Sequence, residues 1–229
     1  MVCYLLVHGA ANGPWVFEGW DGDLGAPCDV ADLQPLVGPG TSMEHYAAAV
    51  RDKAAAMAEA PVLIGWSLGG LIVLMAARGL RVPAVVVLEP SAPAEVIGHA
   101  AERELREGTI GPEFYGVRPG AAPPPGLSGR EWTWVIERSA GARDSLYARD
   151  QRQRGIDVGP VAAPLLVVHG DVEGNAEQRG PAVARALAGD TLKIAGASHW
   201  ALVVGERYRR EVRGGIRAWV GRVLAPERN

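Results

Sequence analysis

The sequence predicts an α/β protein with a mostly parallel sheet of about six strands flanked by helices. Short apolar runs rich in β-branched residues alternate along the chain with segments of helical periodicity. A glycine-rich turn joins one of these runs directly to a helix, within residues 61–79. The alternation breaks between Ser91 and Gly159, where a longer segment of different character is inserted. Together these features indicate a parallel α/β core with one insertion.

The candidate strands are short and almost free of charge in their centres. Strands of a parallel sheet are covered on both faces, so they read as continuous apolar runs rather than as alternating ones. Four candidate strands have this character: "CYLLVH" (3–8), "PVLIGW" (61–66), "AVVVLE" (84–89) and "PLLVVH" (164–169). Two further candidates, "DVADL" (29–33) and "DTLKI" (190–194), also carry charged residues.

The helices between these strands show apolar residues at helical spacing. A helix over 41–60 is expected to begin with a capping box formed by Thr41 and Glu44. The apolar run after residue 67 predicts a helix that ends at Gly79. The last helix, over about 204–224, carries one apolar stripe: Tyr208, Val212, Ile216, Trp219 and Val223.

The inserted segment predicts a small helical cap. It contains a charged, helix-like stretch over 93–108, a Pro/Gly-rich run over 116–129, and two further helices around 130–139 and 142–153. A structureless loop of this length inside a compact domain is uncommon. We therefore expect a core made of residues 1–90 and 160–229, with residues 91–159 forming a cap.

Composition excludes several functional classes. The chain has 229 residues, 48% of them hydrophobic, and a net charge of −3, which argues against a nucleic-acid-binding domain. Two cysteines do not make a disulfide framework or a zinc site, and we expect no metal or cofactor. Residues 60–77 carry no charge, but glycines interrupt them, so no membrane span is expected. With no leader-like N-terminus, a cytoplasmic protein acting on a small molecule is the expectation.

The segment "IGWSLGGL" (64–71) places Ser67 between a strand and a helix. A strand that turns into a helix within a few residues needs glycine at positions of close approach. Ser67 is therefore expected at the tip of a sharp turn, with its hydroxyl projecting from the sheet edge. The G-x-S-x-G spacing also arises by chance in a chain with 30 glycines, so the motif needs partners.

Candidate partners follow other strands at their carboxyl ends, where ligands bind in open parallel sheets. "HGAANG" after the first strand offers backbone N–H groups that, with the N–H of Leu68, would form an oxyanion hole. His199 lies in a loop before the last helix and is the best general base. Three acids are open as its partner: Asp171, Glu173 and Glu89. The order serine, acid, histidine fits one particular fold.

These residues resemble the α/β-hydrolase superfamily, in its serine-nucleophile branch and as a compact, esterase-like member. "GWSLGG" is similar to the family's nucleophile elbow, "LLVHGA" to its oxyanion loop and "ASHW" to its histidine loop. The resemblance implies a sheet that lacks the family's first strands and carries a cap where members have their lids. It also implies site residues: Ser67 as nucleophile, His199 as base, the N–H groups of Ala10 (with Ala11 as runner-up) and Leu68 as oxyanion hole, and Glu173 as acid ahead of Asp171 and Glu89.

The expected function is a cofactor-independent serine hydrolase that cleaves a small or medium carboxylic ester, or a thioester, through an acyl-enzyme. The same residues also suit three other reactions: C–C bond hydrolysis, hydroxynitrile-lyase-like cleavage of cyanohydrins, and perhydrolysis. The alternative outside the enzymes is a ligand-binding scaffold without catalytic activity. Aromatic residues are expected to line the pocket, although they also suit a cap core: Trp66, Trp132, Trp134, Tyr115 and Trp200.

Overall fold

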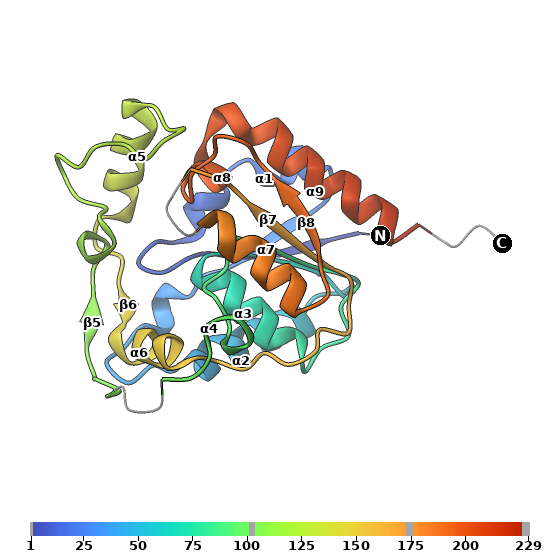
Figure 1. The fold of residues 1–229 in the computed structure, drawn as a ribbon, viewed down its shortest axis with the longest axis horizontal. Coiled ribbons are helices and arrows are strands. Elements are labelled where there is room, and N and C mark those ends of the chain that lie inside the picture. Colours follow the sequence, from blue (N-terminus) through green and yellow to red (C-terminus); the bar gives the residue numbers. More distant parts are fainter. Residues whose placement is uncertain (1, 101–103, 173–175, 226–229) are drawn as a thin grey trace.

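A six-stranded parallel sheet forms the centre of the computed structural model, which describes residues 2–100, 104–172 and 176–225 (Figure 1). The strand order is β2–β1–β3–β4–β7–β8, and every neighbouring pair is parallel. The predicted fold class is therefore confirmed, and each strand lies within a residue or two of its expected bounds: β1 Tyr4–Val7, β2 Cys28–Ala31, β3 Val62–Trp66, β4 Val85–Leu88, β7 Leu165–His169 and β8 Asp190–Lys193.

Alternate residues of the central strands enter two separate apolar cores. Along β1, Leu5 and Val7 pack in one core, whereas Tyr4 and Leu6 pack in the other. Because successive side chains of a strand point to opposite faces, an uninterrupted apolar run supplies both cores at once. Burial of each such side chain contributes roughly 1.5–3 kcal/mol relative to leaving it in water.

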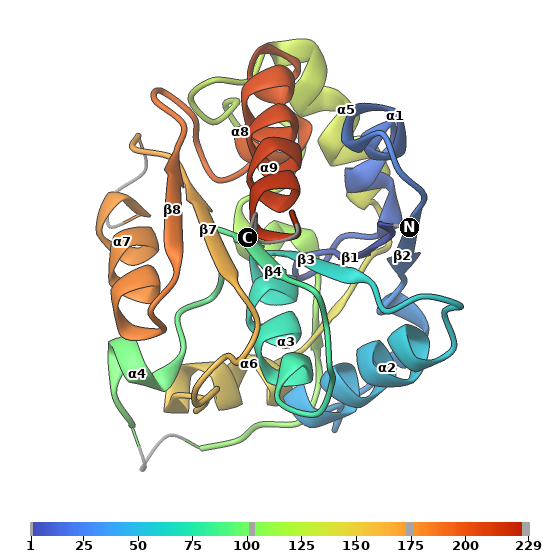
Figure 2. The ribbon, with the colours of Figure 1, turned by 90° about the vertical axis from the view of Figure 1, so that its right-hand side faces the viewer.

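Helices cover both faces of the sheet (Figure 2). One face packs against α2 (Met43–Ala55), α3 (Leu68–Ala77) and α7 (Ala176–Ala186). The other face packs against α1 (Trp20–Leu24), α8 (Ala201–Val204) and α9 (Arg209–Val223). The uncharged segment 60–77 is thus a buried strand followed by a short helix, and no helix in the described ranges is long and apolar enough to cross a membrane.

The helix expected over 41–60 begins one residue later than its predicted capping box. Ser42, not Thr41, is the N-cap, and its side chain accepts a hydrogen bond from the N–H of His45 while the His45 ring accepts from the N–H of Ser42. The hydroxyl of Thr41 instead donates to the carbonyl of Leu36 at 2.7 Å. The preceding turn thus uses the Thr41 hydroxyl, and the neighbouring serine takes the capping role.

The insertion contains several short elements, drawn in green and yellow in Figure 1. They are α4 (Ala94–Ile97), β5 (Thr109–Ile110), the 3-10 helix Pro112–Tyr115, α5 (Gly129–Ser139), β6 (Asp144–Ser145) and α6 (Leu146–Arg154). α5 agrees with the helix expected around 130–139, whereas α6 begins at Leu146, after β6, rather than at residue 142. The single helix expected over 93–108 does not form, because α4 ends at Gly98, where φ is +71°. That residues 91–159 form a separate cap remains a prediction.

Candidate active site

Ser67 occupies a strained turn between β3 and α3. Its φ of 57° and ψ of −119° lie where a non-glycine residue is rarely found and cost about 1–3 kcal/mol. Three backbone hydrogen bonds hold the residue there. Its N–H donates to the carbonyl of Leu88 at 3.0 Å, and its carbonyl accepts from Gly70 at 3.0 Å and from Ser91 at 2.9 Å. The surrounding backbone therefore fixes the serine in a conformation that its own preferences oppose.

Two glycines of the motif allow the sharp turn by permitting close backbone contacts. A Cβ added at Gly69 would lie 2.1 Å from the carbonyl oxygen of Val7 in β1. A Cβ added at Gly65 would lie 2.2 Å from the carbonyl oxygen of Gly69. Any larger side chain at either position would push the start of α3 away from the sheet. The spacing around Ser67 is thus explained by packing of α3 on β1 and β3.

The loop after β1 is anchored by polar contacts on its far side. His8 is buried, and its Nδ1 lies 2.9 Å from the carbonyl of Gly9 while its Nε2 accepts from the N–H of Leu33 at 3.0 Å. The side chain of Asn12 donates to the carbonyl of Ala10 at 2.9 Å. Among the residues that the structure describes, none accepts a hydrogen bond from the N–H of Ala10 or of Leu68. These two donors therefore remain available near Ser67.

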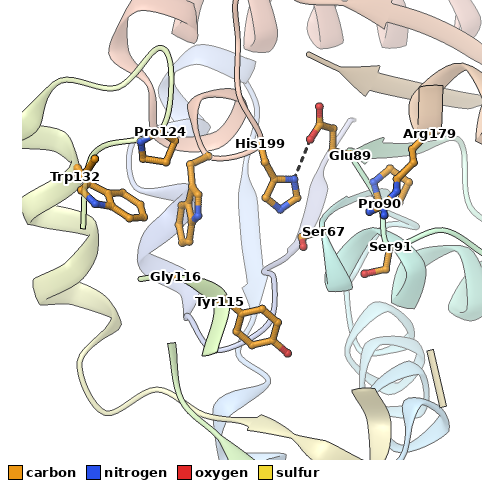
Figure 3. Close-up of a pocket in the computed structure, with 12 residues that line it drawn as sticks. Ser67, Glu89, Pro90, Ser91, Tyr115, Gly116, Pro124, Trp132, Arg179 and His199 are labelled. Carbon is orange, nitrogen blue, oxygen red and sulfur yellow. Dashed lines mark hydrogen bonds and ion pairs between the residues drawn. The ribbon is translucent and has the colours of Figure 1, made fainter. Parts of the chain in front are cut away.

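His199 follows β8 and bonds to a carboxylate at the end of β4. Its Nδ1 lies 2.9 Å from Oε2 of Glu89, and its second ring nitrogen points toward Ser67 (Figure 3). The indole N–H of Trp66 donates to the carbonyl of His199 at 3.1 Å. The residue next to the serine thereby holds the histidine loop in place.

Glu89 is buried and fixed by the backbone. Its Oε1 accepts from the N–H of Gly170 at 2.9 Å, and its N–H donates to the carbonyl of Val168. Burial raises the pKa of Glu89, but the hydrogen bond and charge of His199, with the Gly170 N–H, bring it below its ordinary value. The carboxylate is therefore ionised at neutral pH beside the imidazole.

The other two candidate acids differ from Glu89. Asp171 accepts from the N–H of Gly196 at 2.7 Å and pairs with Lys193 at 3.1 Å. Asp171 therefore ties the loop after β7 to β8 and its following turn, whereas Glu89 is the described acid that bonds to His199. Glu173 lies outside the described residues.

Two neighbouring cavities open at Ser67. The first, of about 560 Å³, is lined on one side by aromatic and apolar residues that include Trp132, Trp200 and Pro124. The second, of about 460 Å³, reaches Ala10 and Trp66 and continues toward α6. The two share the following lining residues: Ser67, Ser91, Tyr115, Arg179, His199 and Trp200. A substrate bonded at Ser67 would therefore have space on two sides.

Comparison with known proteins establishes the family. The model of the "Alpha/beta hydrolase family" matches residues 4–213. The chain belongs to the alpha/beta hydrolase family. An esterase from Rhodococcus sp. is 19% identical, with a TM-score of 0.69 over 97% of this chain and 91% of that one. A monoacylglycerol lipase from Paleococcus ferrophilus is 20% identical, with a TM-score of 0.66 over 96% and 94%. The comparison with curated proteins gave no match.

Most residues expected at the site of this alpha/beta hydrolase lie around the two cavities. Ser67, His199, Ala10, Trp66, Tyr115, Trp132 and Trp200 line at least one of them. Trp134 lines neither: its ring packs edge-on against Trp15 at 5.0 Å, so its expected pocket role is corrected. The sequence analysis missed Arg149 and Arg152 of α6, which line the second cavity. No local motif marks them, since only the folded insertion brings α6 to the site.

Proposed function

We propose that this alpha/beta hydrolase is a serine hydrolase that cleaves a small or medium carboxylic ester, or a thioester, through an acyl-enzyme. One observation carries the proposal: the strained Ser67 and the Glu89–His199 pair line the same cavity. A serine hydroxyl is a weak nucleophile at neutral pH and needs an adjacent base. A carboxylate bonded to the other ring nitrogen holds that base in the productive tautomer.

In the proposed reaction Oγ of Ser67 attacks the ester carbonyl while Nε2 of His199 takes the hydroxyl proton. The N–H groups of Ala10 and Leu68 stabilise the oxyanion that forms. The tetrahedral intermediate then collapses, the C–O bond to the alcohol breaks, and His199 returns the proton to the leaving alcohol. Water repeats the sequence on the acyl-enzyme and releases the acid. Glu89 remains ionised and stabilises the imidazolium in both halves.

Hydrolysis of aryl acetate esters tests this proposal. We expect turnover by the native protein and a loss of about 10³-fold or more in kcat for Ser67→Ala, because the nucleophile is gone. Ser91→Ala is the matched control, since its hydroxyl lines the same cavities but follows β4 rather than the elbow. We expect this control to retain most of the native kcat. Full retention of turnover by Ser67→Ala would refute the proposal.

A further inference from the structure

The second cavity at Ser67 is lined by three arginines and by no aspartate or glutamate among the described residues. Arg149 and Arg152 come from α6, and Arg179 comes from α7 and also borders the first cavity. The acid that borders the first cavity is Glu89, which bonds to His199. The positive charge of the second cavity therefore needs an explanation that the hydrolytic residues do not supply.

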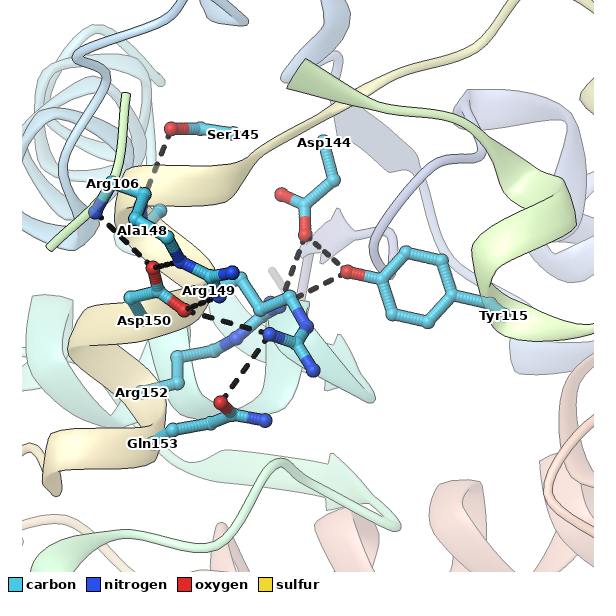
Figure 4. Close-up of polar contacts among 9 residues, drawn as sticks. All are labelled: Arg106, Tyr115, Asp144, Ser145, Ala148, Arg149, Asp150, Arg152 and Gln153. Carbon is cyan, nitrogen blue, oxygen red and sulfur yellow. Dashed lines mark hydrogen bonds and ion pairs between the residues drawn. The ribbon is translucent and has the colours of Figure 1, made fainter. Parts of the chain in front are cut away.

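Arg152 is held rigidly at the wall of this cavity (Figure 4). Its side chain is only 9% exposed, and Nη2 donates to Oδ2 of Asp144 at 3.0 Å and contacts the hydroxyl of Tyr115 at 3.3 Å. Tyr115 in turn donates to Asp144 at 2.5 Å. Nη1 of Arg152 is buried and has no hydrogen-bond partner within the described part of the chain. Nη1 is shielded from solvent, so Arg152 contributes its positive charge to the cavity wall rather than this donor.

Arg149 adds a positive charge that its neighbours neutralise only weakly. Its guanidinium lies 4.6 Å from the ring centre of Phe114, and its nearest described carboxylate oxygen is Oδ1 of Asp150, at 3.5 Å. Asp150 is already engaged by Arg106 through two side-chain hydrogen bonds of 2.8 Å (Figure 4). Asp144 balances Arg152, so the cavity keeps the positive charge of Arg149 together with that of Arg179, which lines both cavities.

We propose that this cavity binds a carboxylate of the substrate, so that the enzyme prefers esters that carry a free carboxylate group. This inference rests on the proposed ester hydrolysis at Ser67, which lines the same cavity. Guanidinium groups bind carboxylates through charge-assisted and often paired hydrogen bonds, which are stronger in a partly buried site. The cation–π contact between Arg149 and the ring of Phe114 favours the present orientation of the guanidinium.

The test compares monomethyl glutarate with dimethyl glutarate, which present the same methyl ester with and without the negative charge. We expect kcat/KM to be about tenfold or more higher for the monoanion, the gain typical of a hydrogen bond to a charged group. Arg149→Met should remove most of this preference. Arg210→Met, an exposed arginine of α9 far from the cavity, is the matched control and should leave the preference unchanged. A preference for the monoanion that persists in Arg149→Met would overturn the inference.

The acetate ester of 3-hydroxypropanoate places the carboxylate on the alcohol side instead of the acyl side. Preference for this ester over ethyl acetate, lost in Arg149→Met, would support the same cavity with the opposite orientation of the substrate. A lack of charge preference in both pairs of esters would overturn the inference while leaving ester hydrolysis intact.

Binding of glutarate to Ser67→Ala, followed by calorimetry, separates the inference from the proposed function because it needs no turnover. We expect binding that weakens about tenfold or more in the double variant with Arg149→Met. If no ester were cleaved but glutarate still bound in this manner, the hydrolytic proposal would fail and the carboxylate site would stand. Absence of glutarate binding would overturn the carboxylate site.

Discussion

Glu89 and His199 lie 110 residues apart in the chain and are joined by a hydrogen bond of 2.9 Å between Oε2 and Nδ1. β4 lies directly between β3, which leads to Ser67, and β7. Glu89 follows β4, so its carboxylate lies at the edge where the loops after these strands meet. Its backbone φ of 35° and the hydrogen bond from Gly170 direct the side chain toward the histidine. The unusual conformation of Glu89 therefore places its carboxylate beside the imidazole, as the proposed function requires.

Replacing Glu89 with glutamine tests this pair. We expect kcat for ester hydrolysis to fall by about 10³–10⁴-fold, because the amide neither fixes the tautomer of His199 nor stabilises the imidazolium. Asp171→Asn is the matched control and should keep kcat within a few-fold, since Asp171 bonds to Gly196 and Lys193. Steady-state kinetics of both variants, with circular dichroism to check folding, provide the measurement. Near-native kcat in Glu89→Gln together with a large loss in Glu173→Gln would contradict the assignment.

Replacing Gly69 with alanine tests the packing that creates the turn. The added methyl would overlap the carbonyl oxygen of Val7, so we expect a loss of about 3 kcal/mol or more in the free energy of unfolding. Gly214→Ala is the control: this exposed glycine lies inside α9 with no heavy atom within 4 Å of an added Cβ. We expect it to stabilise by about 0.5–1 kcal/mol. Urea unfolding of both variants measures the difference, and equal effects would refute the packing argument.

Much of the fold could be predicted from the sequence because local patterns determine it. The apolar runs identify the four central strands, β1, β3, β4 and β7, because a strand covered on both faces is apolar along its length. The edge strands β2 and β8 are partly exposed, and their position in the strand–helix alternation identifies them. The helix expected over 93–108 fails because Gly98 adopts a left-handed φ and ends α4 after one turn. Residue spacing alone does not reveal which glycine inside a helical pattern will terminate it.

The site was less predictable where it depends on tertiary geometry. Ser67 and His199, which line one cavity, were predicted as site residues because each lies in a distinctive local sequence beside a strand end. Three acids also follow strand ends, and their positions in the sequence do not show which carboxylate lies close enough to bond to the imidazole of His199. The order of β3, β4 and β7 in the sheet was the missing information. Arg149 and Arg152 had no signal at all, since their helix reaches Ser67 only through the fold of the insertion.

The depressed pKa of Glu89 predicts a specific acid dependence of stability. Its pKa in the folded protein lies below its ordinary value of about 4.5, so the unfolded chain takes up the proton first as pH falls. The stabilisation is therefore fully present above that ordinary value and is lost as pH falls through the folded value. We expect the free energy of unfolding to fall less between pH 6 and pH 3 in Glu89→Gln than in the native protein. Urea titrations at each pH provide the measurement, and parallel curves would contradict the predicted linkage.

The Cys28 thiol is predicted to be unreactive at neutral pH. Burial, followed by the charge of Asp21, raises its pKa to about 12, so the nucleophilic thiolate is scarce. We expect treatment with iodoacetamide at pH 8 to leave ester hydrolysis unchanged, even when the treatment lasts long enough to alkylate glutathione completely. Intact mass and residual activity are followed together. Inactivation that accompanies alkylation, and that Cys28→Ala prevents, would point to a thiol in the reaction.

The most direct test of the central claim is the intact mass of the protein after treatment with a fluorophosphonate, which reacts with activated serines. The account predicts one adduct on the native protein and none on Ser67→Ala. It also predicts slow labelling of Glu89→Gln, because Glu89 acts through His199 to activate the hydroxyl of Ser67. Absence of an adduct on folded native protein, or an equal adduct on Ser67→Ala, would contradict the account.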